Sequence, residues 1–216
     1  MLPLLSGRDV RVVELPRFGR AFRPAETAGW LAEALEPDTD LVGHSLGGLV
    51  AATVAVTRPD VVRRLVLVAP VGAGDPLPVR RYGTGLARTL ATSPPGLLRT
   101  MIGDAARWGP EALARGAFAA MRHRFAGEIG APTLVIWGSR DKLVPSELGL
   151  AWLQLIPGAR LEILRGAGHV PMVDAPSTFA RVVLRFLDEP GDVGGVGPLG
   201  GVSGAGKDGE PPAREQ

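Results

Sequence analysis

The length, composition and charge of this chain set the first limits on what it can be. It has 216 residues, a formal net charge of +2 and no cysteine. This length fits one domain with a sizeable core, because domains usually hold about 100 to 200 residues. Without cysteine, the chain forms no disulfide, no thiolate zinc site and no cysteine nucleophile.

Charge and hydropathy predict neither a membrane partner nor a nucleic-acid partner. The sequence has no stretch of about 18 apolar residues, and its first residues lack the basic start of a secretory signal. The pairs Arg63-Arg64 and Arg80-Arg81 are separated rather than gathered in one basic stripe, which is typical of a solvated surface. We therefore expect a cytoplasmic protein, and its oligomeric state stays open.

The chain begins with an alternation of strand and helix. Residues 10–15 favour a strand, and residues 25–35 favour a helix with one apolar face. Residues 40–42 are typical of the end of a buried strand, and the apolar run at residues 49–56 predicts a buried helix. Strands that alternate with helices in this way usually form a parallel sheet.

Between that strand and that helix lies a serine enclosed by glycines, in the motif Gly43-His44-Ser45-Leu46-Gly47. A serine on a sharp strand-to-helix turn projects its Oγ above the edge of a sheet. The flanking glycines lack the Cβ atoms that would collide where strand and helix approach closely. The motif therefore indicates that Ser45 is a nucleophile, and His44 is expected to support the turn rather than perform chemistry.

The middle of the chain interrupts the alternation. Residues 65–68 are strongly apolar, as in a parallel strand covered on both faces. From about 72 to 128, glycine, proline, alanine and arginine are mixed with scattered apolar residues, and we predict a small helical lid there. The strand-helix pattern resumes over residues 133–187. The glycine-rich and polar composition of residues 190–216 predicts a disordered tail.

Two further candidate residues follow strands in the C-terminal half. The apolar run at 133–135 precedes the segment at 136–145, which places Asp141 on a loop, and the run at 161–164 precedes Gly166-Ala167-Gly168-His169. Ligands bind at the carboxyl ends of the strands in open parallel sheets. We therefore expect Asp141 and His169 to face Ser45 at that edge.

Other acids and histidines have more ordinary explanations. Asp174 and Glu189 fall at helix boundaries, where capping or solvation accounts for a carboxylate. Asp104 and His123 lie in the predicted lid, where exposure or local packing is the simpler interpretation. Asp141 alone combines a loop after a strand with a position between the serine and the histidine.

The order Ser45, Asp141, His169 resembles that of the α/β-hydrolase family, and the likeness extends from about residue 10 to about residue 188. The resemblance implies an α/β fold with a mostly parallel sheet flanked by helices, in one domain at residues 1–189. It also implies an enzyme with no cofactor and no metal, which acts on a small-molecule substrate; the fold does not fix that substrate.

In the resembled family a helical insertion covers the active site and shapes the substrate pocket. A helical lid also buries an apolar stripe of its own, so only some of its apolar residues are expected to touch substrate. The pocket candidates are Leu86, Leu90, Met101, Trp108, Phe118 and Met121.

The resemblance gives each site residue a role. Ser45 Oγ attacks a carbonyl, His169 takes and returns the proton, and Asp141 orients the imidazole. The backbone N–H of Leu46 supplies one donor of the oxyanion hole. The family's second donor comes from a His-Gly loop after an earlier strand, and this sequence contains no such loop.

We expect the chain to be shortened at its N-terminus, since residues 10–16 already resemble the strand and turn that follow that loop. In the resembled fold, the missing strand lies between the strand at 10–15 and the strand that leads to Ser45. Without it, those two strands either pair directly or leave backbone groups without partners, at about 1 to 3 kcal/mol for each buried group.

The favoured function is a hydrolase that cleaves a small carboxylic ester or related acyl substrate through a Ser-His-Asp triad and an acyl-enzyme. Hydrolysis of a carbon–carbon bond in a ketone-bearing substrate is a close variant. A different class is a truncated or catalytically impaired α/β-hydrolase-like protein that binds a small molecule or partner. The absent oxyanion loop favours this class, and the complete set of three chemical groups argues against it.

Overall fold

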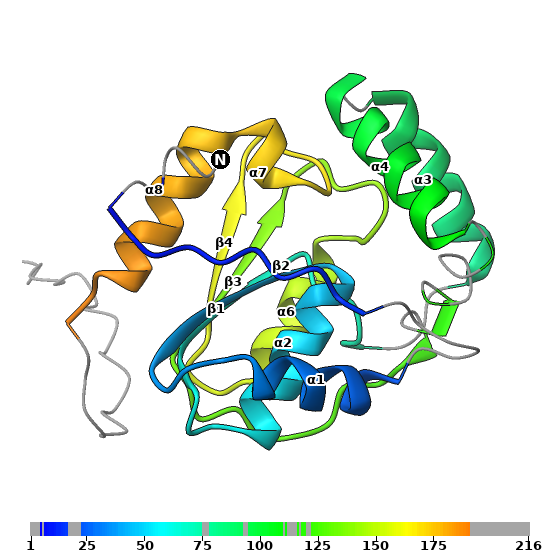
Figure 1. The fold of residues 1–216 in the computed structure, drawn as a ribbon. Coiled ribbons are helices and arrows are strands. Elements are labelled where there is room, and N and C mark those ends of the chain that lie inside the picture. The colour runs from blue at the N-terminus through cyan, green and yellow to red at the C-terminus, as the bar shows by residue number, and fades with distance from the viewer. Residues whose placement is uncertain are drawn as a thin grey trace, which may run out of the picture.

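The fold is built on a parallel β-sheet whose strands run in the order β1-β2-β3-β4 (Figure 1). The strands are β1 (Thr39–His44), β2 (Val62–Val68), β3 (Thr133–Gly138) and β4 (Arg160–Leu164). This computed structural model describes residues 5, 7–16, 23–74, 78–92, 95–109, 111, 116, 118–119 and 122–190. The parallel sheet and its flanking helices confirm the predicted fold class.

Helices cover both faces of the sheet. On one face lie α1 (Pro24–Glu33), α2 (Leu46–Thr57) and α6 (Glu147–Leu155), and on the other lie α7 (Pro171–Asp174) and α8 (Pro176–Leu187). Two more helices, α3 (Val79–Thr92) and α4 (Pro95–Trp108), fall within the predicted lid and are drawn together at one end of the molecule (Figure 1).

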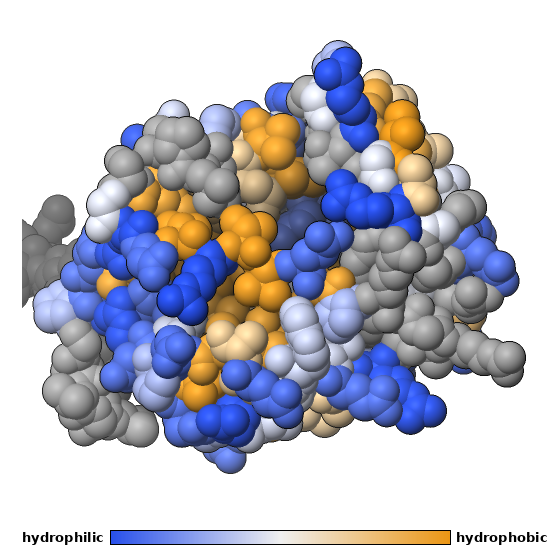
Figure 2. All heavy atoms as spheres, viewed as in Figure 1, coloured by the Kyte–Doolittle hydropathy of each residue, from blue (hydrophilic) through white to orange (hydrophobic). Residues whose placement is uncertain are grey.

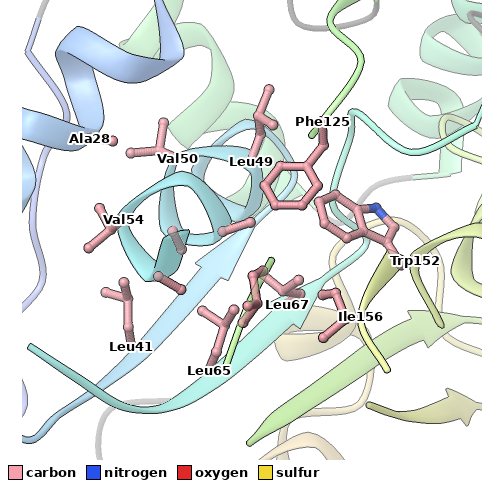
Figure 3. Close-up of a cluster of buried hydrophobic side chains, with 14 of the residues drawn as sticks. Ala28, Leu41, Leu49, Val50, Val54, Leu65, Leu67, Phe125, Trp152 and Ile156 are labelled. Carbon is pink, nitrogen blue, oxygen red and sulfur yellow. The ribbon is translucent and has the colours of Figure 1, made fainter. Parts of the chain in front are cut away.

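Alternate residues of the central strands enter two separate cores. Leu65 and Leu67 of β2 pack with α1, α2 and α6, whereas Val66 and Val68 pack with α8. This explains why the strand is apolar without interruption, since each face meets a helix layer. Figure 3 shows the first core, where Leu49 of α2 lies beside Phe125, and Val50 of the same helix points toward Ala28 of α1.

The turn between β1 and α2 explains the glycines of the serine motif, with one correction. A Cβ on Gly43 would lie 2.5 Å from the Gly47 carbonyl oxygen, so no side chain fits there. A Cβ on Gly47 would meet nothing within 4 Å. The second close approach is instead at Gly48, where a Cβ would lie 2.8 Å from Pro70 Cβ. The expectation that Gly47 relieves a collision was therefore wrong.

The expected strand at residues 10–15 was also wrong. This stretch belongs to no strand, and Val12 is 76% exposed. Backbone in an extended conformation becomes a strand only when a neighbour accepts its hydrogen bonds, and residues 10–15 pair with no strand of the sheet that the structure describes. Figure 2 shows apolar side chains gathered over the middle of the face that is turned toward the viewer. Val10, Val13 and Val42 are among the exposed hydrophobic residues.

Arg8 attaches the start of this stretch to the rest of the molecule. It forms ion pairs with Asp188, after α8, and with Asp40 of β1. At the other end, Leu15 packs against the core that α1 and α2 share. Glu14 also forms an ion pair with Arg107 of α4 at 3.3 Å. Side chains therefore hold the stretch in place, although its backbone pairs with no described strand.

One further expectation is confirmed by the structure, and others lie outside what it tests. The expected helix at 25–35 is present as α1, one residue earlier at its start. Residues 191–216, the expected disordered tail, lie outside the described residues, and the domain boundaries stay predictions. Among the described helices, none is both long and apolar enough to cross a bilayer.

Two alanine substitutions in the turn should separate close packing from open space. Gly43→Ala forces a Cβ against the backbone of α2, and overpacking of this kind costs about 1 to 3 kcal/mol. We expect the midpoint of thermal unfolding to fall by several degrees. Gly47→Ala is the matched control, which should leave the midpoint unchanged or raise it. Equal effects of the two substitutions would contradict the geometry of the turn.

Candidate active site

The structure brings Ser45, Asp141 and His169 together at the carboxyl edge of the sheet. Ser45 lies between β1 and α2, Asp141 follows β3, and His169 follows β4. His169 Nδ1 lies 2.8 Å from Asp141 Oδ2, and His169 Nε2 lies 3.2 Å from Ser45 Oγ. A continuous hydrogen-bonded chain therefore joins the carboxylate, the imidazole and the hydroxyl.

The hydrogen-bond partners assign the tautomer of His169. An ionised carboxylate only accepts, so Nδ1–H donates to Asp141 and Nε2 is left as the acceptor for the Ser45 hydroxyl. The side chains of Asp141 and His169 are 0% and 6% exposed. Water therefore has little access to the bond between them, and His169 is oriented to take a proton from Ser45.

Backbone groups fix the second oxygen of Asp141. The N–H groups of Leu143 and Val144 donate to Asp141 Oδ1 at 2.8 and 2.9 Å. The Val144 carbonyl in turn accepts from the buried indole N–H of Trp137 at 2.9 Å. Both carboxylate oxygens thus have partners, and the carboxylate cannot rotate without breaking hydrogen bonds.

The loop that carries His169 is held by residues that sequence reasoning treated as ordinary. Asp174 was interpreted as a helix-boundary acid, yet its Oδ2 accepts from the Gly168 N–H at 2.7 Å. Ser139 was not singled out, and its Oγ accepts from the Gly166 N–H at 2.9 Å. The position of Asp174, five residues after the histidine, is a sequence signal that could have identified it.

The β3 and β4 loops also meet directly through their backbones. The Arg140 N–H donates to the Ala167 carbonyl at 2.8 Å. Gly138, the last residue of β3, lies so close to the Gly168 carbonyl that any Cβ would collide with it. The loop with Asp141 and the loop with His169 therefore form one packed unit.

His44 reaches this unit from the serine turn. Its Nε2 lies 2.8 Å from the His169 carbonyl oxygen, and the centres of the two rings are 4.9 Å apart. The His44 side chain is half-buried, and the protein atoms packed around it disfavour a charge on its ring. Desolvation, followed by the proximity of His169, lowers the pKa of His44 from 6.5 to about 4.

The residue predicted to donate to the oxyanion, Leu46, lies at the start of α2. Leu46 is the first residue of α2, and the first N–H groups of a helix have no acceptor within it. The helix dipole also places positive potential at this end. The role of the Leu46 N–H, and the second donor, stay predictions.

Helix α3 lies over the histidine loop, which is the segment at residues 165–170 between β4 and α7. The acid loop is the loop after β3 at residues 139–146, which carries Asp141. A cleft of about 30 Å³ beside His169 is lined by Thr89 and Thr92 of α3 and by Arg140 and Lys142 of this loop. Clefts that enclose a ligand usually hold about 300 Å³ or more. This cleft has room for only one or two water molecules, so a substrate would also have to lie against neighbouring surfaces.

The predicted pocket residues do not gather at this cleft. Leu86 is 41% exposed, Phe118 is 42% exposed, and neither they nor Leu90 line it. The side chains of Met101 and Trp108, and all of Met121, lie outside the described residues. Their contact with substrate stays a prediction. In the part of the chain that the structure describes, no group of three or more acids and histidines could hold a metal ion.

Gly85 seats α3 against the acid loop. A Cβ at Gly85 would lie 3.0 Å from Leu143 Cα and still closer to the Lys142 carbonyl oxygen. A side chain at this position would therefore push α3 away from the loop or displace the backbone that binds Asp141. At Gly83, in the same helix, a Cβ would meet nothing within 4 Å.

These two glycines allow a test that needs no substrate. Gly85→Ala should loosen the acid loop, so the amides of Leu143 and Val144 should exchange with deuterium faster than in the wild type. Gly83→Ala should leave their exchange unchanged while it favours the helix. Unchanged exchange in Gly85→Ala would show that α3 does not press on this loop.

Acid should destabilise the protein partly through His44. Its pKa of about 4 in the folded protein is lower than the ordinary value of 6.5 in the unfolded chain. Between these values the unfolded chain binds a proton that the folded protein does not, so stability is lost as pH falls from about 6.5 towards 4. His44→Gln should lose less stability than the wild type when urea unfolding is compared at the two ends of this range. An equal loss would contradict the assignment.

Comparison with known proteins is consistent with this geometry. The model of the alpha/beta hydrolase family matches residues 1–182. The pimeloyl-[acyl-carrier protein] methyl ester esterase of Neisseria meningitidis serogroup B is 29% identical, over 83% of this chain and 82% of that protein. The 2-hydroxymuconate semialdehyde hydrolase of Pseudomonas putida is 30% identical, over 84% of this chain and 78% of that protein.

A solved structure shows the same fold. A thermophilic esterase superposes with a TM-score of 0.68 at 24% identity, covering 82% of this chain and 79% of that one. The family match spans most of the sequence, and it includes the loops that carry all three site residues. The chain therefore belongs to the α/β-hydrolase family of hydrolytic enzymes.

Proposed function

We propose that the protein hydrolyses a small carboxylic ester through an acyl-enzyme on Ser45. The observation that carries this proposal is the hydrogen-bonded chain from Asp141 through His169 to Ser45. An unassisted hydroxyl is a weak nucleophile near pH 7, and a neutral imidazole within hydrogen-bond reach is the usual activating base.

The first half of the reaction forms the acyl-enzyme. Ser45 Oγ attacks the ester carbonyl carbon while its proton passes to His169 Nε2. The carbonyl oxygen becomes an oxyanion, which the Leu46 N–H at the start of α2 stabilises. When the C–O bond breaks, the alcohol leaves with the proton from His169, and the acyl group stays on Ser45.

The second half returns the free enzyme. A water molecule gives a proton to His169 Nε2 and attacks the acyl carbon. The tetrahedral intermediate collapses, the carboxylic acid leaves, and Ser45 Oγ recovers its proton from His169. Asp141 stays ionised throughout, because its part is to hold Nδ1–H and to stabilise the imidazolium.

Two arguments favour an ester as the substrate class, one from a similar protein and one from the chemistry of the site. One of the similar proteins is named a methyl ester esterase, and nucleophilic cleavage of an ester uses a hydroxyl activated by an imidazole, as the chain from Asp141 to Ser45 would provide. The acyl group and the alcohol are left unspecified by the proposal.

Carbon–carbon bond hydrolysis is the second candidate. A 30% identical relative is named 2-hydroxymuconate semialdehyde hydrolase, and the same three residues suit attack on a ketone. Assays on matched ester and vinylogous diketone substrates distinguish the two. A larger kcat/KM on the diketone would replace the ester proposal with this one.

Substitution of the three residues tests the mechanism. Ser45→Ala and His169→Ala should each lower kcat on a short-chain p-nitrophenyl ester by about 10⁴-fold or more, and Asp141→Asn by about 10⁴-fold. Ser146→Ala is the control, since the Ser146 side chain makes no capping hydrogen bond at α6 and does not line the cleft beside His169.

A fluorophosphonate probe separates the enzyme from a protein that only binds ligands. Wild-type protein should be labelled, and mass spectrometry should locate the label on Ser45. Ser45→Ala should not be labelled. Wild-type protein that is folded but neither labelled nor active would favour the impaired, ligand-binding alternative.

A further inference from the structure

We propose that His44 is a positioning residue. Its hydrogen bond would hold the histidine loop against the serine turn, which is the turn between β1 and α2 that carries Ser45. Its ring would hold His169 Nε2 within reach of Ser45 Oγ without taking part in proton transfer. The inference rests on the proposed function, because it assigns His44 a part in the reaction of the same site.

The position of His44 suits such a connection. It is the last residue of β1 and the immediate neighbour of Ser45, and its Nε2 lies 2.8 Å from the His169 carbonyl oxygen. A carbonyl oxygen only accepts, so His44 Nε2 carries the hydrogen. One side chain thus links the backbone beside the nucleophile to the backbone of the base.

The other attachments of the histidine loop lead elsewhere. Gly166 and Gly168 donate to Ser139 and Asp174, and Ala167 accepts from Arg140. These partners follow β3 or lie in α7, so they hold the loop against the acid loop and the α8 side. Among the described residues, the hydrogen bonds from the loop to the serine turn are those of His44 and of Ser45 Oγ itself.

The difference between these two bonds is what gives His44 its role. The bond between Ser45 Oγ and His169 Nε2 must break each time Oγ carries the acyl group. The bond from His44 involves no reacting atom, so it persists through the cycle. It would keep the loop in register while the catalytic bond is absent, and a displacement of about 1 Å at such a site can cost 10²-fold in rate.

His44 also has to remain uncharged for this role. The titratable groups that act on His44 are His169 and Asp141, and His169 gains a positive charge when it takes the Ser45 proton. A second cation 4.9 Å from that ring would oppose the proton transfer. With its pKa at about 4, His44 is neutral at the pH where His169 must accept a proton.

Two substitutions separate the hydrogen bond from the ring. His44→Phe keeps an aromatic ring beside His169 but cannot donate, whereas His44→Gln keeps an N–H donor without the ring. We expect His44→Phe to lower kcat on a p-nitrophenyl ester and the rate of fluorophosphonate labelling by about 10- to 100-fold, with little change in KM. His44→Gln should recover most of the lost rate.

The pH profile distinguishes positioning from chemistry. If His44 only positions the loop, the acidic limb of kcat/KM in His44→Gln should keep the midpoint of the wild type. If both variants lose activity equally, or if the limb disappears in His44→Gln, His44 acts as an acid or base and the proposal is wrong. If His44→Phe retains full activity, the bond has no positioning role.

Two controls keep the outcomes distinct. Wild-type protein that is neither labelled nor active would overturn the proposed function itself, whereas labelled wild type with unaffected variants would overturn only this inference. If His44→Phe does not fold, as judged by circular dichroism, His44→Asn replaces it. The shorter side chain of asparagine cannot span the same distance, so it should lose rate in the same way.

Discussion

The sharp turn at Ser45 is the constraint on which the rest of the site depends. Ser45 has φ of 52° and ψ of −115°, a sparsely populated backbone conformation that costs a non-glycine residue about 1 to 3 kcal/mol. Its N–H donates to Val68 of β2 at 2.8 Å, and its carbonyl accepts from Gly48 and Leu49 at 3.0 and 3.3 Å. These bonds, together with the buried helix α2, offset the strain. The direction of the serine hydroxyl is consequently set by the sheet and the helix rather than by the side chain alone.

The other two residues are placed by a different device, which is the packing of two loops on each other. Gly138 and Gly168 approach too closely for a side chain, and the Arg140 N–H donates to Ala167 across the same interface. Asp141 and His169 are therefore oriented as a pair before any substrate binds. In water, aligning such groups would cost entropy during the reaction, whereas here that cost is met when the protein folds. Only the contact with the serine turn has to be maintained separately.

Features that depend on neighbouring residues, such as the short motifs, could be predicted from the sequence. Features that depend on a contact with another part of the chain could not. The turn, its serine and the two loops follow from short motifs, because the residue types there are fixed by backbone geometry. Residues 10–15 have the composition of a strand, but a strand exists only beside another, and composition does not say which neighbour is present. Ser139 was missed for the same reason, since its partner is the Gly166 amide of a loop distant in sequence. Asp174 accepts from Gly168, only six residues away, and it was missed because a carboxylate at a helix boundary already has an ordinary explanation. Gly48 rather than Gly47 is the close contact because Pro70, also distant in sequence, packs against it.

The two histidines of the site show how environment divides the roles of identical side chains. His169 has an acceptor at Nδ1 and a hydroxyl at Nε2, so proton exchange with Ser45 reorganises no other partner. The Nε2–H of His44 is directed to a carbonyl that can only accept, and its surroundings disfavour the imidazolium. Protonating His44 would add a charge beside His169, and among the described residues the hydrogen bond of its ring is the one to the His169 carbonyl oxygen. The tautomer of each ring is thus dictated by what faces its nitrogens, and this is why one imidazole suits proton transfer while the other suits holding a loop in place.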